Sequence, residues 1–282
     1  MRDSIFIKKD YPEKSDVKGV LKVFNFFLEM NIKTYEKIDP KLMICHPYFS
    51  SSHFITNYTE YNIYDLTELE DFNKAVNYVK EITGEYIENI MSDDSPESAS
   101  RVVTHCIMNI TKPFRTFFFK MIFPYLSKTD IAENLRFIWK SCDYVNVDNH
   151  ISKDSYIYLF TQFSDQLMED DEKYTYNKLM DFDSIAIYRG SNSVTKHPEI
   201  NALSYTTSYE TALSFANNIV DRNKDAKKSV VTIEIKPHPD WLLCYMEDEH
   251  EVVVNYRRMK KYIIFQETNN LEGERMRRWI QL

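Results

Sequence analysis

Residues 202–216 read A-L-S-Y-T-T-S-Y-E-T-A-L-S-F-A, and this stretch decides the fold of the second half of the chain. Its first five residues, 202–206, are of the kind that form a short strand. Thr207 and Glu210 have the S/T-x-x-E spacing of a capping box, which predicts that a helix begins directly after the strand. The buried face of that helix is predicted at four apolar positions with helical spacing: Ala212, Phe215, Ala216 and Ile219.

Other short strand-like runs lie on both sides of this stretch. Residues 184–189 are mostly apolar and stop at Gly190. Residues 229–236 alternate with a period of two, which predicts a half-buried strand. Residues 251–254 and 261–265 are rich in Val and Ile and predict two more strands.

Before about residue 182 the pattern is helical. Apolar residues recur at helical spacing in five segments: 20–28, 69–82, 98–109, 131–139 and 156–168. We expect Gly84 to end the second of these helices. The sequence therefore predicts an α+β protein, with a mainly helical region over residues 1–150 and a second region over residues 151–282. A boundary near residues 149–154 and one near residues 170–172 both fit this pattern.

Composition excludes several classes of protein. The chain has 282 residues, of which 43% are hydrophobic and 15% aromatic, so it can bury a core and is not disordered. It has only four scattered glycines, so neither a G-x-G-x-x-G site nor a P-loop fits. The net charge of −8 argues against a broadly basic nucleic-acid binder, although residues 255–282 hold seven Lys or Arg against three acids.

The chain has no sequence signal for a membrane, an export signal or a metal. The most apolar stretch, residues 115–126, is too short to span a bilayer, and the N-terminus has no apolar signal region, so we expect a cytoplasmic location. The four cysteines include no C-x-x-C pair, which favours reduced thiols. Cys45-His46 and His105-Cys106 are weak candidates for zinc, and we expect no metal.

Polar residues occupy strand positions where apolar ones are usual. Arg189 ends one strand, Ser204 and Thr206 share a face of the next, and Glu249 and Glu251 share a face at the start of another. Residues two apart on a strand point the same way, so each pair can line one site. Together they would suit an anionic, sugar-bearing ligand. The alternative is a structural Arg189–Glu251 ion pair with hydroxyls that cap strands.

Three motifs in order resemble the R-S-E class of mono-ADP-ribosyltransferases. They are Tyr188-Arg189-Gly190, then Ser204-Tyr205-Thr206 in place of S-T-S, then Glu249-His250-Glu251 as E-x-E. The family has Ala and Phe-Ala at fixed offsets after its S-T-S motif, and Ala212 and Phe215-Ala216 fit those offsets. An alternative register takes Thr206-Thr207-Ser208 as the motif. The resemblance covers residues 185–265, and residues 1–180 are not recognised.

The resemblance implies NAD⁺ as a substrate and a split β-sheet core. Arg189 would bind phosphate or the adjoining ribose with its planar set of donors. The backbone of Gly190 would approach the nicotinamide amide, and Phe215 would also contact NAD⁺. Ser204 would hold the carboxylate of the catalytic glutamate, and Thr206 would brace the strand.

Two glutamates would perform the chemistry. Glu251 would stabilise the oxocarbenium character that develops as the nicotinamide–ribose bond breaks. Glu249 would face the acceptor and act as its general base or orient it. The preceding loop, residues 237–248, would recognise the target through Trp241 and Tyr245. These two aromatic residues could instead cover the edge of the core.

The acceptor is open at this stage. An E-x-E motif in this class usually goes with protein arginine, which we favour. The basic residues between Arg257 and Arg278 and the many tyrosines leave nucleic-acid bases as an alternative, and NAD⁺ hydrolysis as another. We expect a toxin-like effector held by an inhibitor or antitoxin protein that binds the N-terminal half. A non-enzymatic binding module is the hypothesis from a different class.

Overall fold

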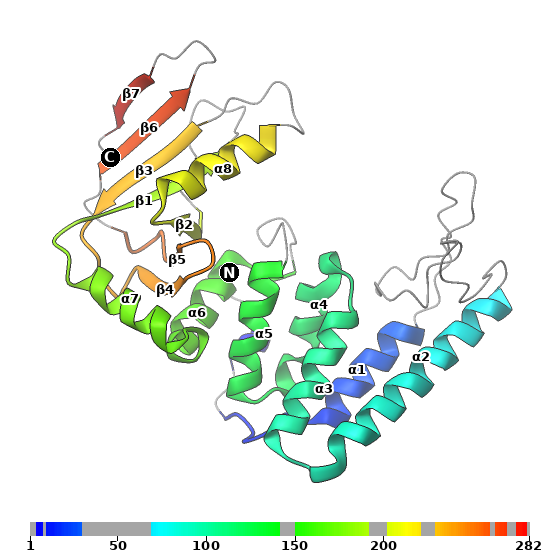
Figure 1. Cartoon of the computed structure of the whole chain (residues 1–282). Helices are drawn as coiled ribbons and strands as arrows, with labels where there is room; N and C mark the ends of the chain where they lie inside the picture. The colour runs from blue at the N-terminus through cyan, green and yellow to red at the C-terminus, as the bar shows by residue number, and fades with distance from the viewer. Residues whose placement is uncertain are drawn as a thin grey trace. The chain divides into compact units, whose positions relative to one another are not determined.

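The computed structural model describes residues 4–7, 10–29, 69–141, 150–191, 202–220, 229–259, 263–269 and 275–280. The chain divides into two compact units, Met1–Ser155 (unit 1) and Tyr156–Leu282 (unit 2). Unit 1 is helical where it is described, and unit 2 combines helices with an antiparallel sheet (Figure 1). The protein is thus mixed α+β, as predicted.

Unit 1 is built from helices whose apolar faces were visible in the sequence. They are α1 (Val17–Glu29), α2 (Leu69–Ile90), α3 (Pro96–Asn109), α4 (Lys112–Ile122) and α5 (Lys128–Ser141), with short 3-10 turns η1 (Ser4–Phe6), η3 (Met91–Asp93) and η4 (Phe123–Tyr125). The predicted helices at 20–28, 69–82, 98–109 and 131–139 are confirmed. Helix α4 was not predicted, because Phe117, Phe118 and Phe119 run together and hide its periodicity.

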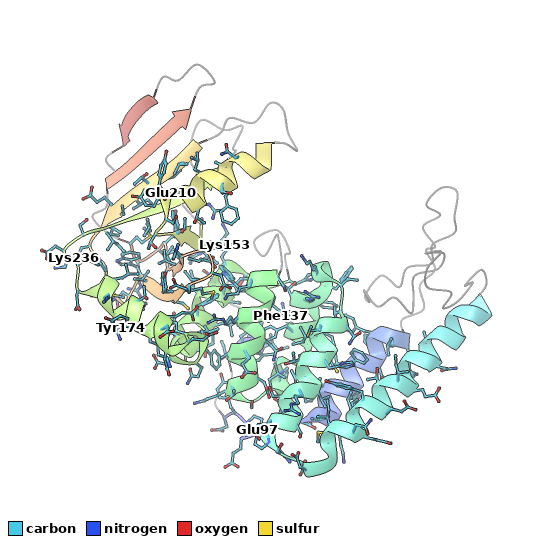
Figure 2. The ribbon with its side chains drawn as sticks, in the orientation of Figure 1. Glu97, Phe137, Lys153, Tyr174, Glu210 and Lys236 are labelled. Carbon is cyan, nitrogen blue, oxygen red and sulfur yellow. The ribbon has the colours of Figure 1, made fainter. Side chains whose placement is uncertain are left out.

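Aromatic side chains form the core of unit 1. Phe24, Phe27 and Phe118 are fully buried. The rings of Phe27 and Phe118 meet edge to face, with centroids 5.4 Å apart. Figure 2 shows side chains filling the spaces between these helices.

The expectation that Gly84 ends a helix is wrong, since α2 continues to Ile90. A single glycine inside a helix costs only about 1 kcal/mol relative to alanine, which a long helix tolerates.

Two helices precede the sheet. Helix α6 (Lys153–Leu167) crosses the division between the units, and it confirms the predicted segment at 156–168. Helix α7 (Asp170–Met180) was not predicted. It begins with a capping box in which Glu169 and Glu172 satisfy each other's backbone amides.

The sheet of unit 2 has seven strands in the order β4-β5-β2-β1-β3-β6-β7, all paired antiparallel. They are β1 (Ile185–Ser191), β2 (Ser204–Thr206), β3 (Ser229–Ile235), β4 (Leu242–Met246), β5 (Glu251–Val254), β6 (Ile263–Asn269) and β7 (Arg275–Ile280). Helix α8 (Tyr209–Val220) packs on β1 and β3 through Ala212 and Ala216, and α7 lies against β4 (Figure 1). At the surface of this unit lie Tyr174, Glu210 and Lys236 (Figure 2).

One weak connection divides the sheet into two halves. Seven residue pairs join β1 to β3, from Ile185↔Ile235 to Ser191↔Ser229. Within the described residues, a single ladder pair, Tyr188↔Thr206, joins β1 to β2. We call this pair the junction. It connects a β4-β5-β2 half to a β1-β3-β6-β7 half.

Two predictions about loops and caps are wrong. Residues 237–248 are not one loop, because Leu242–Met246 forms β4 with every residue buried. The N-cap of α8 is Ser208 and not Thr207, since the amide of Thr211 donates to Ser208 Oγ at 3.2 Å. Thr207 contacts the turn ahead of β5 instead: its amide donates to the carbonyl of His250 at 2.9 Å, and its hydroxyl donates to the same oxygen at 3.4 Å. Residues 255–282 are the part of the chain that is rich in Lys and Arg. Residues 275–280 of this part form β7, and Lys260 and Lys261 lie outside the described residues.

Candidate functional site

The predicted site residues come from three neighbouring strands. Arg189 and Gly190 lie on β1, Ser204 and Thr206 on β2, and Glu251 opens β5. These strands are adjacent in the order β5-β2-β1. Segments that are remote in the sequence therefore meet around the junction.

Thr206 and Glu251 face each other directly. They are register partners on β2 and β5, and Thr206 is also the partner of Tyr188 on β1. Residues directly opposite on antiparallel strands share a face, with Cβ atoms about 5 Å apart. Both side chains are buried, at 5% and 9% exposure. Ser204 pairs instead with Val253, so the hydroxyl residue opposite Glu251 is the one that leads the alternative T-T-S register.

Arg189 reaches the same region from the other face of β1. It follows Tyr188 in the strand and pairs with Val231, so its Cβ alternates away from the row of Tyr188, Thr206 and Glu251. Its guanidinium Nη1 donates to the carbonyl oxygen of Ser204 at 2.8 Å. The arginine thus ties β1 to β2 beside the junction. A guanidinium has five N–H donors, and this bond uses one of them.

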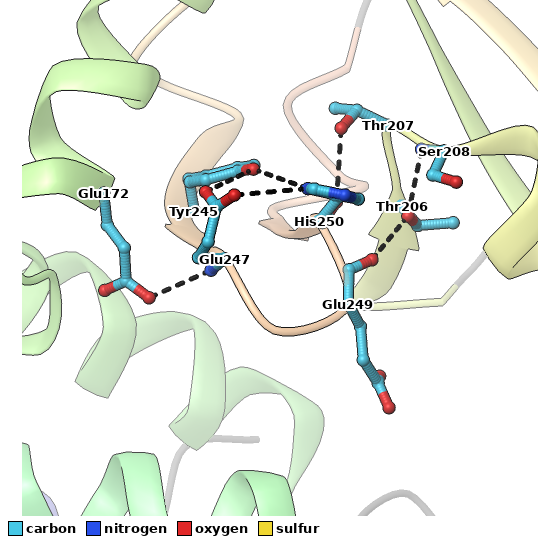
Figure 3. Close-up of polar contacts among 8 residues, drawn as sticks. All are labelled: Glu172, Thr206, Thr207, Ser208, Tyr245, Glu247, Glu249 and His250. Atoms are coloured by element: carbon cyan, nitrogen blue, oxygen red, sulfur yellow. Dashed lines mark hydrogen bonds and ion pairs between the residues drawn. The ribbon is translucent and has the colours of Figure 1, made fainter.

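Glu249 does not share a strand face with Glu251. It lies in an exposed turn, residues 247–250, ahead of β5. His250, between the two glutamates, has φ of 48°, in the left-handed region. This conformation breaks the two-residue alternation on which the prediction depended. Figure 3 shows the side chain of Glu249 pointing away from Tyr245 and His250.

Thr206 fixes the backbone of this turn. Its hydroxyl donates to the carbonyl oxygen of Glu249 at 2.7 Å and accepts from the amide of Ser208 at 3.1 Å. Since a hydroxyl has one proton, Thr206 donates to the turn and not to the carboxylate of Glu251. This placement fits the bracing role that the resemblance implied for Thr206.

A second set of contacts joins the side chains of the turn. The Tyr245 hydroxyl donates to Glu247 Oε2 at 2.9 Å and lies 3.0 Å from His250 Nδ1 (Figure 3). Burial raises the pKa of Tyr245 well above its usual value, and the bond to Glu247 adds to the shift. The amide of Glu247 donates to Glu172 Oε1 at 2.9 Å. The turn is therefore connected to both β4 and α7.

Gly190 on β1 lies against α8, the helix that contains Phe215. A Cβ at Gly190 would lie 2.2 Å from the carbonyl oxygen of Ala212 and 2.7 Å from the amide of Ala216. The missing side chain thus lets α8 approach β1 closely. Phe215 is 41% exposed, so it is not part of the buried face that the sequence predicted. The side chain of Ile219 lies outside the described residues. Contacts of Gly190 and Phe215 with NAD⁺ remain predictions.

Trp241 and Tyr245 do not present their rings to an acceptor. They are 3% and 2% exposed. The indole Nε1 of Trp241 donates to the carbonyl of Lys236 at 3.1 Å. Their burial fits the alternative that these aromatic residues cover the core, and only the hydroxyl of Tyr245 reaches the turn.

The sequence missed Glu172, Glu247 and the role of His250. Glu169 and Glu172 form the capping box of α7, but the usual sequence signal has Ser or Thr at the first of these positions, so E-x-x-E does not mark a helix start in the sequence. No sequence signal indicates that Glu172 also binds a turn 75 residues away. Nor does one indicate that a histidine adopts a left-handed backbone, since glycine and asparagine are the usual residues there.

The candidate zinc residues do not form a metal site in the part of the chain that is described. His105 stacks on Tyr86 with ring centroids 4.1 Å apart, and burial lowers its pKa. Cys106 is buried, which raises the pKa of its thiol. Cys45 and His46 lie outside the described residues. No group of three or more His, Cys, Asp or Glu side chains that could hold a metal occurs in the described ranges.

None of the described helices is both long enough and apolar enough to cross a membrane. Comparisons of the chain with protein-family models, with curated proteins and with solved structures gave no match.

Proposed function

We propose that this chain is an NAD⁺-dependent mono-ADP-ribosyltransferase that transfers ADP-ribose to a macromolecular acceptor, with protein arginine as the favoured acceptor. One observation carries the proposal: the three segments that match the R-S-E pattern lie on three adjacent strands around one junction. Arg189, Thr206 and Glu251 are far apart in the sequence. A chance resemblance would not require them to be neighbours.

The division of the sheet supports the same proposal. The resemblance implies a split β-sheet core, and in the part of the sheet that is described a single ladder pair joins the two halves. The polar residues of the motif lie on the two strands that this pair joins and on the adjacent strand β5. A ligand that binds there would contact side chains from both halves.

The residues match the chemical needs of NAD⁺ cleavage. The guanidinium of Arg189 suits the pyrophosphate, since planar donors pair well with phosphate oxygens. The carboxylate of Glu251 suits the developing oxocarbenium ion. As the ribose C1′–N bond breaks, its electron pair leaves with neutral nicotinamide. The acceptor nitrogen then bonds to C1′ and gives its proton to Glu249.

Charge around the turn favours a cationic acceptor. Glu247, Asp248 and Glu249 are consecutive and exposed. Only His250 separates them in the sequence from Glu251. Their negative potential attracts a guanidinium and repels the phosphates of a nucleic acid. Protein arginine is therefore the acceptor that this surface fits best.

A nucleic-acid base is the second candidate acceptor, and one observation favours it. Arg257 and Arg258 are exposed shortly after β5, and both could contact phosphates. The two candidates predict different products from the same reaction. Transfer should be found in the protein pool for the first and in the RNA or DNA pool for the second.

The test uses the full chain with labelled NAD⁺ and separate protein and nucleic-acid pools. Glu251→Gln should lower transfer by about 10²–10³-fold, because it removes the charge that stabilises the transition state. The matched control is Glu234→Gln, the same substitution at an exposed site on β3. It should leave both folding and transfer as in the unmodified chain.

Each outcome has a clear meaning. Label found only in nucleic acid would overturn the arginine acceptor, and release of free ADP-ribose alone would indicate hydrolysis. If Glu251→Gln folds normally and keeps its transfer rate, the site assignment is wrong. If the unmodified chain neither transfers nor cleaves NAD⁺, a non-enzymatic binding module becomes the better hypothesis.

A toxin-like role with an inhibitor bound to the helical half is part of the same proposal. An enzyme that modifies cytoplasmic macromolecules would slow the growth of a cell that expresses it. Induced expression of the unmodified chain should therefore arrest growth, and Glu251→Gln should relieve the arrest. Normal growth with both chains at equal levels would argue against a toxin.

A further inference from the structure

His250 is a residue to which the motif assigns no role, yet its backbone decides how the two glutamates are placed. A non-glycine residue with φ of 48° is unusual and persists only when its surroundings hold it. In a regular strand, Glu249 and Glu251 would point to one face. With His250 left-handed, Glu249 stays in the exposed turn, while Glu251 enters β5 and is buried opposite Thr206.

The backbone of His250 is held on both sides. Its amide donates to the carbonyl of Glu247 at 3.0 Å. Its carbonyl accepts from the amide of Thr207 at 2.9 Å, and the Thr207 hydroxyl lies 3.4 Å away. The turn is thereby closed on itself and attached to the segment that follows β2 (Figure 3).

The imidazole is held by a fixed pattern of donors. The Tyr245 hydroxyl gives its one proton to the carboxylate of Glu247, so its oxygen can only accept from His250. The proton of the imidazole therefore sits on Nδ1, directed at Tyr245 at 3.0 Å, with Glu247 Oε1 at 3.7 Å. Because the ring of Tyr245 is buried in β4, these contacts anchor the exposed imidazole to the core.

We propose that His250 is a positioning residue of the candidate site, which holds Glu249 at the surface and Glu251 against Thr206 through its left-handed backbone and its bonds to Tyr245 and Glu247. The inference rests on the proposed transferase function and assigns a role within it. His250 acts through the two glutamates and needs no contact with NAD⁺ or the acceptor.

Four substitutions in the full chain separate the backbone from the side chain. His250→Ala removes the imidazole and disfavours the left-handed conformation. His250→Gly removes the imidazole but permits that conformation. His250→Asn permits it and supplies an amide donor in place of Nδ1. Tyr245→Phe keeps the buried ring and removes the hydroxyl. His238→Ala, an exposed histidine after β3, is the matched control.

The kinetic arm measures kcat and KM for NAD⁺. His250→Ala should lower kcat by about 10²-fold, the effect of misplacing a catalytic group by about 1 Å, and change KM by less than about two-fold. His250→Gly should lose about ten-fold and His250→Asn should recover to within about five-fold of the unmodified chain. A His250→Gly variant with unchanged kcat, or a His250→Ala variant with unchanged kcat, overturns the proposal.

The second arm needs no activity. Amide hydrogen exchange should become faster at Thr207, at Glu247 and at position 250 in His250→Ala and Tyr245→Phe, and stay unchanged in α8. If the unmodified chain has no transferase activity, the proposed function fails, and this arm alone decides the positioning role. Unchanged exchange in the turn of both variants overturns it.

Discussion

Asp130 in unit 1 and Glu172 in unit 2 occupy the same place in their helices. Each is the third residue of its helix, α5 or α7, and each is 2% exposed. Each also joins the start of its helix to a remote segment. Asp130 accepts from the hydroxyl of Ser15, and Glu172 accepts from the amide of Glu247.

Their surroundings differ in a way that matters for function. Asp130 Oδ2 also accepts from the Ser127 hydroxyl at 2.9 Å, and Ser15, Ser127 and Asp130 are all buried. Glu172 Oε2 accepts from the amide of Glu169 at 2.8 Å, while its other oxygen reaches the exposed turn ahead of β5.

A buried carboxylate at the third position of a helix therefore has different partners in the two units: serine hydroxyls at Asp130, and the amides of Glu169 and Glu247 at Glu172. In unit 1 the buried carboxylate of Asp130 accepts hydrogen bonds from two buried serine hydroxyls. In unit 2 the equivalent carboxylate holds a turn at the surface, beside the strand that carries Glu251. The first arrangement stabilises a helix bundle. The second stabilises the geometry of a candidate site, and we expect it to contribute less to the free energy of unfolding.

The largest effect on stability is expected at Asp130. Asp130→Ala should lower the free energy of unfolding of unit 1 by about 3 kcal/mol, because it leaves the buried hydroxyls of Ser15 and Ser127 without their acceptor. Glu172→Ala should cost unit 2 only about 1 kcal/mol, since water can reach the amide of Glu247. Urea unfolding of the full chain, followed by hydrogen exchange in peptides of each unit, measures both.

Asp130→Asn is the control for this pair. It keeps the size of the side chain and one acceptor oxygen, so it should cost less than Asp130→Ala. Equal losses in Asp130→Ala and Glu172→Ala would contradict the distinction between a core carboxylate and a turn carboxylate.

Much of the fold could be predicted, because amphipathic helices and half-buried strands have apolar residues at regular spacing in the sequence. Val20, Phe24, Phe27 and Leu28 define α1, and the alternation of residues 229–236 defines β3. Strand β4 was missed because L-L-C-Y-M is buried on both faces and has no alternation. Helix α7 was missed because its composition is mostly polar.

The sequence suggested that the strands with the candidate residues are neighbours, but it did not indicate how the side chains are arranged. The order of Arg189, the hydroxyl residues and Glu251 suggested neighbours, and the strand order agrees with that suggestion. That Thr206 lies opposite Glu251 depends on a register, which local sequence does not fix. The separation of Glu249 from Glu251 depends on one backbone angle at His250, which several contacts from remote segments maintain.

The two units also differ in how closely their glycines pack against neighbouring atoms. Gly190→Ala should cost about 2 kcal/mol, because the new methyl group meets the backbone of α8, which cannot move aside. Gly19→Ala in unit 1 should cost less, since its Cβ would meet the ring of Tyr125, a side chain that can rotate. Gly84→Ala has no atom within 4 Å and should stabilise α2 by up to about 1 kcal/mol.

Thermal and urea unfolding of the three variants rank these effects. The expected order of stability is Gly84→Ala, the unmodified chain, Gly19→Ala and Gly190→Ala. A Gly190→Ala variant as stable as the unmodified chain would mean that α8 does not lie as closely on β1 as the distances indicate.

The smallest effect concerns the attachment of α7 to β4. The hydroxyl of Tyr176 donates to the carbonyl of Leu242 at 2.8 Å, and burial is the main cause that raises its pKa from 10.0 to about 12. Between these pH values the unfolded chain releases the phenolic proton while the folded chain retains it, so stability should fall as pH rises.

The loss should be complete by about pH 12, absent below pH 10, and smaller than about 2 kcal/mol because Tyr176 is only half-buried. Tyr176→Phe should weaken this alkaline dependence but not remove it, since the pKa of Tyr245 is raised in the same direction. Urea midpoints measured from pH 9 to pH 12, with phenolate absorbance as the proton count, test it. If Tyr176→Phe keeps the full dependence, the Tyr176 hydroxyl is not the group that loses stability at alkaline pH, and the dependence must come from other groups whose pKa is raised on folding, such as Tyr245.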